Sequence, residues 1–309
     1  MSIVWQAAAG PQAFNRLGYV RWFLVRRGVP RRERRIVHNS RMDRQSHMST
    51  VAAVITWAMA LSVLHTPTAA RQKEAPVSVE ASILVYHRFG PVVHDSMTIR
   101  TATFRTQLAY LKEHKHPIIP LGALVNHLLG KGPAPPAGAV VITIDDGHAS
   151  VFSEALPLLR EYRVPVTLFI YPSAISNASY AMKWDQLAEL SRTGLVDIQS
   201  HTYWHPNFKT ERRRLSPEAF RSFVTMQFAK PRTVLRDKLG VDATMLAWPF
   251  GIYDDDLIAS ATQAGYVAGF TLDRRQVTRQ QRMMALPRFL VVDSDSGARF
   301  AAMLPREAR

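Results

Sequence analysis

The feature that most constrains the fold is a series of short, mainly apolar runs that recur between residues 80 and 292. Each run is four to six residues long, which suits a strand buried on both faces of a sheet. The runs are Ile83–Tyr86, Ala139–Ile144, Val166–Ile170, Val196–Ser200, Met245–Trp248, Ala268–Leu272 and Arg288–Val292. We expect each of them to form a β-strand.

Amphipathic segments separate these runs and predict helices. Their apolar residues recur at helical spacing, as Phe104, Leu108 and Leu111 do. We expect Pro231 to interrupt or kink the longest helix, because proline removes a helical hydrogen bond. Strands alternating with helices favour an α/β fold with a parallel sheet, either a closed or nearly closed (β/α) barrel or an open doubly wound sheet. The expected helices are Phe104–His114, Leu121–Leu129, Ser150–Tyr162, Trp184–Arg192, Pro217–Leu239 and Asp254–Ala264.

The positive charge of the chain, +15 in total, is concentrated near its N-terminus. Residues 1–50 contain ten Lys or Arg side chains against two acidic ones, Glu33 and Asp43. The densest basic run, Arg26–Arg35, precedes an apolar stretch instead of lying among aromatic residues on a folded surface. Nucleic-acid binding would need that combination, so we expect no nucleic-acid partner.

An uncharged stretch of fourteen residues, Val51–Leu64, follows the basic segment. It is shorter than the roughly 20 residues that span a bilayer, and its length is typical of the apolar part of a secretory signal peptide. We therefore expect residues 48–70 to be a signal peptide or an uncleaved anchor. Residues 1–47 are expected to be disordered or to precede the true start. The following domain is expected to be exported, periplasmic or extracellular, and to reach the membrane only through this segment.

The chain contains no cysteine, so any metal site must be built from His, Asp or Glu side chains. In a β/α barrel, chemistry gathers at the carboxyl ends of the strands. Asp145 and Asp146 follow the apolar run 139–144 in this way, directly before Gly147. Adjacent carboxylates repel each other unless a cation or proton intervenes, so one can bind a metal while the other serves as a base. The alternative is a solvated turn, which Asp and Gly also favour.

Two further clusters follow apolar runs. His201 and His205 come directly after residues 196–200 and are four residues apart, which lets both imidazoles face one ion if the segment turns. Imidazoles combined with a carboxylate are a common catalytic zinc set. Residues 247–251, Ala-Trp-Pro-Phe-Gly, are a weaker signal, because Pro and Gly also close strands in ordinary turns.

Together these clusters resemble the motifs of the polysaccharide deacetylases, the NodB-homology family of carbohydrate esterases (family four). The motifs of that family are T-F-D-D-G, H-S/T-x-x-H-P and R-x-P-Y/F-G, and the chain has TIDDG, HTYWHP and AWPFG in the same order. The resemblance covers residues 80–295 and implies a single domain with a deformed (β/α) barrel. Residues 296–309 are left as a C-terminal tail.

The resemblance implies a role for each motif residue. Asp145 would be the general base, and Asp146, His201 and His205 would bind a divalent metal, Zn²⁺. The backbone N–H of Phe250 would donate to the oxyanion. The implied enzyme is a polysaccharide N-deacetylase, a hydrolase that removes N-acetyl groups from an amino-sugar polymer such as poly-N-acetylglucosamine, peptidoglycan or chitin.

Two parts of the family pattern are missing. Ala247 stands where the third motif begins with an arginine that contacts the catalytic aspartate, and no His follows His205 to supply a general acid. His87, which ends the first strand, is similar to the early His of the subgroup that deacetylates poly-N-acetylglucosamine. We expect His87 to be the acid and Arg288 to replace the missing arginine. The alternatives are a core histidine satisfied by the backbone and an arginine in a surface salt bridge.

Aromatic residues beside the motifs are candidates for holding a sugar ring. They are Tyr203, Trp204 and Trp248, and core packing is their alternative role. Two other functions stay open: a glycan-binding homologue without catalysis, which the two missing residues favour, and a metal-dependent hydrolase of another amide or acetyl ester. Phosphoester hydrolysis is disfavoured, because the motifs hold no basic residue for an anion.

Overall fold

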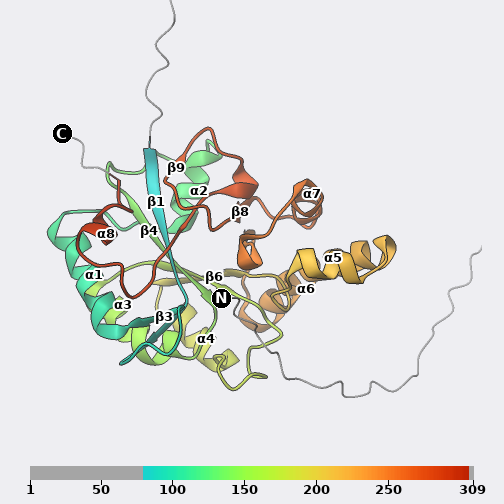
Figure 1. The fold of residues 1–309 in the computed structure, drawn as a ribbon, viewed down its shortest axis with the longest axis horizontal. Helices are drawn as coiled ribbons and strands as arrows, with labels where there is room; N and C mark the ends of the chain where they lie inside the picture. The colour runs from blue at the N-terminus through green and yellow to red at the C-terminus, as the bar shows by residue number, and fades with distance from the viewer. Residues whose placement is uncertain (1–78, 306–309) are drawn as a thin grey trace, which may run out of the picture. The chain divides into compact units, whose positions relative to one another are not determined.

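A curled sheet of mainly parallel strands forms the centre of this computed structural model, which describes residues 79–305 (Figure 1). Along the sheet the strand order is β10-β1-β4-β5-β6-β7-β8, and all these neighbours are parallel. The strands are β1 (Val79–Tyr86), β4 (Val140–Asp146), β5 (Val166–Ile170), β6 (Val196–Ser200), β7 (Met245–Ala247), β8 (Ala268–Phe270) and β10 (Phe289–Leu290). A short strand, β9 (Val277–Thr278), pairs antiparallel with β1, and β2 (Arg88–Gly90) pairs with β3 (Thr98–Arg100) in a separate small sheet.

The segment that follows β8 joins the two sides of the sheet. Leu286 forms a parallel bridge with Phe270 of β8, and its N–H donates to the carbonyl of Gly269. Three residues later, Phe289 pairs with Leu84 of β1. Because β7, β8 and β10 are only two or three residues long, the ring is irregular. The predicted deformed (β/α) barrel is therefore confirmed, and the alternative of an open doubly wound sheet is wrong.

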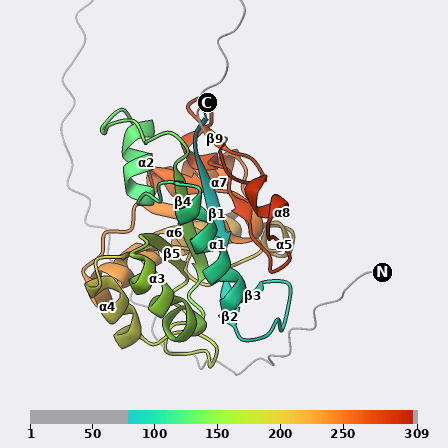
Figure 2. The same cartoon turned by 90° about the vertical axis from the view of Figure 1, so that its left-hand side faces the viewer.

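Helices cover the outside of the sheet. In Figure 1, α1 and α3 lie on the left of the sheet, whereas α5, α6 and α7 gather on its right, and Figure 2 shows α1 in front of β1. A π-helical turn, η1 (Val151–Ala155), leads into α3, so the single helix predicted from residue 150 is divided. The helices are α1 (Thr101–Glu113), α2 (Leu121–Leu128), α3 (Leu156–Tyr162), α4 (Trp184–Arg192), α5 (Phe208–Arg214), α6 (Pro217–Leu239), α7 (Asp255–Gln263) and α8 (Ala298–Ala301).

The longest helix, α6, continues without a break across Pro231, so the interruption expected there does not occur. Its N-terminus is capped by the Ser216 side chain, and it ends at Gly240, whose φ of 70° is left-handed. Phe228 and Leu235 lie on either side of the proline and are fully buried. Their packing stabilises both halves of the helix, which offsets the hydrogen bond that proline removes.

Alternation along the strands divides the core between the two faces of the sheet. On β4, Val140 and Ile142 belong to the cluster that packs under α1 and α3, whereas Val141 packs with the cluster on the other face. Thr143 and Asp145 lie two and four residues after Val141 on the strand, so their side chains are on the same face as that of Val141, and both are buried. Since side chains alternate between faces, the strand itself directs Asp145 to the face opposite α1 and α3.

The packed structure extends past residue 295. Phe300 of α8 and Met303 are fully buried in the core, and the Ser82 hydroxyl of β1 donates to the Met303 carbonyl at 2.6 Å. Within residues 79–305, no helix combines the length and apolarity needed to cross a bilayer. The signal or anchor segment expected at residues 48–70, and the basic segment before it, lie outside the described residues.

Candidate active site

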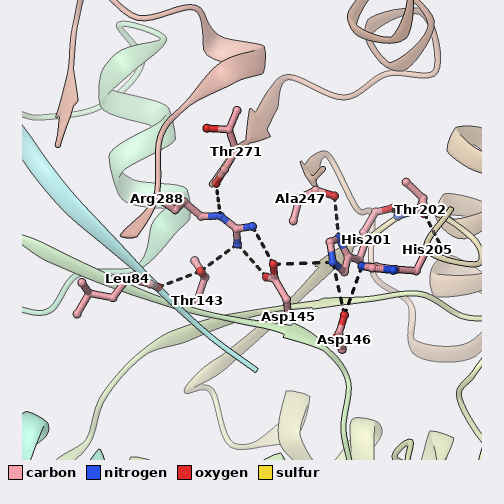
Figure 3. Close-up of polar contacts among 11 residues, drawn as sticks. Leu84, Thr143, Asp145, Asp146, His201, Thr202, His205, Ala247, Thr271 and Arg288 are labelled. Atoms are coloured by element: carbon pink, nitrogen blue, oxygen red, sulfur yellow. Dashed lines mark hydrogen bonds and ion pairs between the residues drawn. The ribbon is translucent and has the colours of Figure 1, made fainter. Parts of the chain in front are cut away.

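The ends of β4 and β6 bring the predicted metal-binding side chains together (Figure 3). Asp146 is the last residue of β4, and His201 and His205 follow β6. Asp146 Oδ1 lies 3.6 Å from Nε2 of His201 and 3.6 Å from Nε2 of His205. One ligand atom from each of the three residues lies within 4.8 Å of the other two. Asp146 and two histidines that lie at least 55 positions further along the sequence therefore form one cluster.

The backbone is strained where these side chains are presented. Within residues 79–305, seven residues other than glycine have a positive φ, and four of them lie in the motif loops. Their φ angles are 77° at Asp146, 66° at Thr202, 61° at His205 and 57° at Phe250. The left-handed region costs about 1–3 kcal/mol for such residues and persists where the surrounding structure demands it. At Asp146 it turns the chain out of the strand, so that both neighbouring carboxylates face the same site.

Contacts behind the histidines fix their orientation. Nδ1 of His201 lies 2.8 Å from the carbonyl of Ala247, which can only accept, so a neutral ring carries its proton on Nδ1. The lone pair of Nε2 then faces the cluster. The backbone N–H of His205 donates to the Thr202 hydroxyl at 3.2 Å. A carbonyl partner like that of His201 commonly orients a metal-binding imidazole, whereas the Thr202 contact holds the backbone of His205.

Two features of the cluster suit a divalent cation: the distances between its ligand atoms, and a carboxylate oxygen that has no hydrogen-bond partner among the described residues. Tetrahedral zinc with bonds of about 2.0–2.1 Å holds its ligand atoms roughly 3.4 Å apart, close to the 3.6 Å found around Asp146 Oδ1. That oxygen is buried and has no hydrogen-bond partner among the described residues. One carboxylate and two imidazoles also leave positions open for water and substrate.

Asp145 is held by Arg288 inside the barrel (Figure 3). The two guanidinium nitrogens donate to its two carboxylate oxygens at 2.8 and 2.7 Å, and both side chains are almost completely buried. Arg288 also donates to the Thr271 carbonyl at 3.1 Å and to the Thr143 hydroxyl at 3.2 Å. The surface salt bridge that was the alternative for Arg288 is therefore wrong. Arg288 makes the aspartate contact expected of the arginine that Ala247 replaces.

These surroundings keep Asp145 ionised. Burial acts to raise the pKa of the carboxyl group, but the charge of Arg288 and its hydrogen bonds outweigh it and lower the pKa to about 2. Oδ2 of Asp145 also lies 3.8 Å from Nε2 of His201. A carboxylate beside a cation site is thus available to accept a proton at neutral pH.

His87 directly follows β1 and lies near both aspartates. Burial lowers the pKa of its ring, and the charges of Asp145 and Asp146 act in the opposite direction. Its Nδ1 is buried without a hydrogen-bond partner among residues 79–305. The alternative, a core histidine whose Nδ1 is hydrogen-bonded to the backbone, is therefore wrong. Nδ1 is available to donate or accept a proton.

The aromatic side chains of the motif loops divide into exposed and buried groups. Phe250 is 57% exposed, and its ring centre lies 4.6 Å from that of His205. Trp204 is 45% exposed and packs on Phe223 with ring centres 5.4 Å apart. Tyr203 is partly buried, and the ammonium group of Lys230 lies 4.0 Å from its ring centre. These side chains have surface on which a sugar ring can stack.

Trp248 was predicted as part of this platform, and that prediction is wrong. Its side chain is fully buried, and its indole N–H donates to the carbonyl of Met284 at 2.8 Å. The ring of Phe228 packs on it with an interplanar angle of 85°. The strand β7 directs Trp248 into the core between the barrel and α6, so no face of the indole is available to a sugar.

Tyr171 was missed by the sequence analysis. Its ring centre lies 5.3 Å from that of His205, and its hydroxyl lies 2.7 Å from the hydroxyl of the exposed Tyr180. Burial foremost, together with this hydrogen bond, raises its pKa, so the phenol stays protonated and can donate. A signal was available, because Tyr171 directly follows the apolar run 166–170 at the carboxyl end of a barrel strand.

Comparisons with known proteins agree with this fold. Residues 132–269 match a family model described as polysaccharide deacetylase. The chain is 28% identical over 192 residues to the poly-β-1,6-N-acetyl-D-glucosamine N-deacetylase of Staphylococcus epidermidis, a match that covers 61% of this chain and 66% of that protein. The chain therefore spans somewhat less than two thirds of the length of that curated relative.

Two solved structures share the fold. IcaB from Ammonifex degensii superimposes with a TM-score of 0.64 at 25% identity and covers 74% of this chain and 97% of that one. The Streptococcus pyogenes deacetylase PplD, solved in complex with acetate, has a TM-score of 0.66 at 18% identity and covers 74% and 100%. Residues 132–269 therefore form a polysaccharide deacetylase domain. The family, the fold and the enzyme class predicted from the sequence are confirmed.

Proposed function

We propose that the chain is a metal-dependent N-deacetylase of an N-acetylglucosamine polymer. The observation that carries the proposal is the convergence of Asp146, His201 and His205 beside the Arg288-bound carboxylate of Asp145. The named activity of the Staphylococcus epidermidis relative supports poly-β-1,6-N-acetylglucosamine as the first polymer to test. A non-catalytic glycan-binding role was favoured by the missing arginine and the missing late histidine. The contact of Arg288 with Asp145 answers the first argument, and the role proposed for His87 answers the second.

Each residue then has a definite task in amide hydrolysis. Asp146, His201 and His205 would hold a divalent ion, which would supply Lewis acidity at the acetyl carbonyl and at the attacking water. Asp145 accepts the proton of the attacking water, and His87 protonates the departing amine. The backbone N–H of Phe250 donates to the oxygen on which negative charge develops. The products are acetate and a polymer with free, positively charged amino groups.

The purified protein is expected to release acetate from N-acetylglucosamine oligomers, and chelation should abolish this release. Replacing Asp146 by Ala removes the only carboxylate of the ion site, and should lower both zinc affinity and acetate release by more than about 100-fold, since even changes behind the ligands cost 10- to 100-fold. Zinc content and acetate release measured on the same samples check this.

Adding zinc back to the chelated protein is the control, and it should restore the activity. Undiminished acetate release from the metal-free protein would contradict the metal-dependent reaction. Bound zinc without acetate release from any amino-sugar polymer would favour the non-catalytic, glycan-binding role. Release from small acetyl esters but not from the oligomers would favour the other hydrolase activity.

Trp204→Ala is expected to raise KM for oligomers about tenfold, with a smaller effect on kcat. Stacking contacts of aromatic rings contribute about 0.5–1.5 kcal/mol, and 1.4 kcal/mol corresponds to a factor of ten. Trp248→Phe is the matched control, because the buried Trp248 should affect thermal stability and leave KM unchanged. Steady-state kinetics on oligomers of several lengths measure both effects, and an unchanged KM for Trp204→Ala would remove it from the platform.

We also propose that the catalytic domain acts outside the cytoplasm. The support is the fourteen-residue uncharged stretch Val51–Leu64 that follows a basic segment. N-terminal sequencing of the protein recovered from the cell envelope should find a mature chain that begins near residue 71 if the signal is cleaved. An anchored form would instead keep residues 48–70 and remain in the membrane fraction. A chain confined to the cytosol would contradict export.

A further inference from the structure

We propose that Gln227, in the middle of α6, is a positioning residue that holds the loop between the two metal-binding histidines. This inference rests on the cation site of the proposed function. Gln227 belongs to none of the motifs and lies 22 residues beyond His205 in the sequence. Its side chain is fully buried.

The side-chain oxygen of Gln227 accepts two hydrogen bonds from consecutive backbone amides. The N–H groups of Tyr203 and Trp204 both donate to Oε1 at 3.1 Å. A carbonyl oxygen has two lone pairs, so both bonds can be made at once. Two donors that converge on one atom also require an acceptor there, which fixes the orientation of the amide group. The contact lies at the centre of the segment from His201 to His205.

This loop needs support because its backbone is unfavourable at both ends. Thr202 and His205 are in the left-handed region, with φ angles of 66° and 61°. Such conformations persist only where the surroundings hold them. On one side, the N–H of Ser173 donates to the carbonyl of Tyr203 at 3.0 Å. Gln227 supplies the opposing contact from α6, so the loop is held between two elements.

Phe228, the next residue on α6, is connected to the same loop through Tyr266 and Ser200. The hydroxyl of Tyr266 lies 2.8 Å from the hydroxyl of Ser200 and 3.1 Å from the carbonyl of Phe228. The Ser200 hydroxyl in turn accepts the N–H of Thr202 at 3.2 Å. The position of α6 relative to the end of β6 is therefore fixed independently of Gln227. Replacing Gln227 should release the loop without displacing the helix.

Without the Gln227 oxygen, two backbone amides lose their acceptor and the loop can leave its left-handed conformation. The ring of His205 would then sample orientations in which Nε2 no longer faces Asp146. Removing a contact behind a metal ligand typically lowers metal affinity about 10- to 100-fold. The expected effect is on metal affinity and ligand geometry.

The experiment compares Gln227→Met with Gln227→Glu in the full chain. Methionine has similar length and volume but no acceptor, whereas a Glu oxygen can accept the same two bonds. Zinc affinity is measured by competition with a chromophoric chelator, and ligand geometry by the visible absorption of the cobalt-substituted protein. We expect Gln227→Met to bind zinc about 10- to 100-fold more weakly with an altered cobalt spectrum. Gln227→Glu should restore the affinity and spectrum of the unmodified chain.

Gln107→Met is the matched control for loss of stability. Gln107 of α1 is also buried and also makes two hydrogen bonds, accepting from the Tyr86 hydroxyl and donating to the Asp295 carbonyl. It should lower thermal stability to a similar extent with zinc affinity unchanged. Equal zinc affinity in Gln227→Met and the unmodified chain would overturn the proposal. So would an equal loss of affinity in Gln107→Met, or the absence of zinc binding by the unmodified chain.

These measurements separate the inference from the proposed reaction, because none of them uses turnover. If the unmodified chain binds zinc and releases no acetate, the proposed deacetylase activity fails. The role of Gln227 is then still decided by the affinities and the cobalt spectra. If acetate is released and Gln227→Met binds zinc normally, the reaction stands and the positioning role is wrong.

Discussion

Asp145→Asn is expected to lower acetate release by about 10²- to 10⁴-fold, the usual contribution of a general base, while zinc remains bound. The amide has the shape of the carboxylate but cannot take up a proton. The proposed ion site consists of Asp146, His201 and His205, so Asp145 is not needed to complete it. Single-turnover acetate release and zinc content, measured on one preparation, test both halves of this expectation.

The variant needs a control for folding, because Asn leaves Arg288 buried without its anionic partner. Thermal unfolding of each variant supplies the control, and only folded protein enters the comparison of rates. Nearly full activity in folded Asp145→Asn would exclude Asp145 as the base. Loss of zinc together with activity would show instead that this carboxylate belongs to the ion site.

Arg288→Met is expected to lower the free energy of unfolding by about 3–5 kcal/mol, the usual cost of removing one partner of a buried ion pair. Methionine is similar in length, but it leaves Asp145 buried and charged with no cation against it. The contacts to the Thr271 carbonyl and the Thr143 hydroxyl are also lost. Urea denaturation of the metal-free protein measures the change without a contribution from bound zinc.

The double variant Asp145→Asn/Arg288→Met is the matched test. It contains no buried charge at this position, so it should be more stable than the sum of the two single losses predicts. A coupling energy of about 1–3 kcal/mol is expected for groups in direct contact. Strictly additive losses would mean that the pair contributes little, and that Arg288 stabilises the barrel through Thr271 and Thr143 alone.

The exposed salt bridge between Arg105 and Glu161 offers a comparison on the surface. Their nitrogen and oxygen approach to 2.5 Å, yet both side chains are about half exposed. Solvent screens such a pair, so it contributes little to stability. Arg105→Met should therefore change the free energy of unfolding far less than Arg288→Met. A similar loss in both variants would contradict the role assigned to burial.

Most of the strands and helices could be predicted from local patterns. The runs Val166–Ile170 and Val196–Ser200 and the helix Trp184–Arg192 begin and end where the sequence places them. The short helix α5 was not predicted, because its sequence is mostly charged and has too few apolar residues to show a period. The interruption expected at Pro231 was wrong, since tertiary packing of α6 outweighs the local cost of a proline.

The sequence by itself determined the alternation of strands and helices and, through its motifs, the residues of the candidate ion site, whereas the choice of a barrel over an open sheet needed the structure. Apolar periodicity follows from local geometry, and strand ends in a parallel barrel meet on one side, so polar residues after the strands must gather there. Only the tertiary structure decided which arginine meets Asp145, which tryptophan faces solvent, and that Tyr171 and Gln227 contact the histidine loop. These outcomes depend on contacts between side chains that are more than 20 residues apart in the sequence. Local sequence patterns do not determine which of these side chains will be in contact.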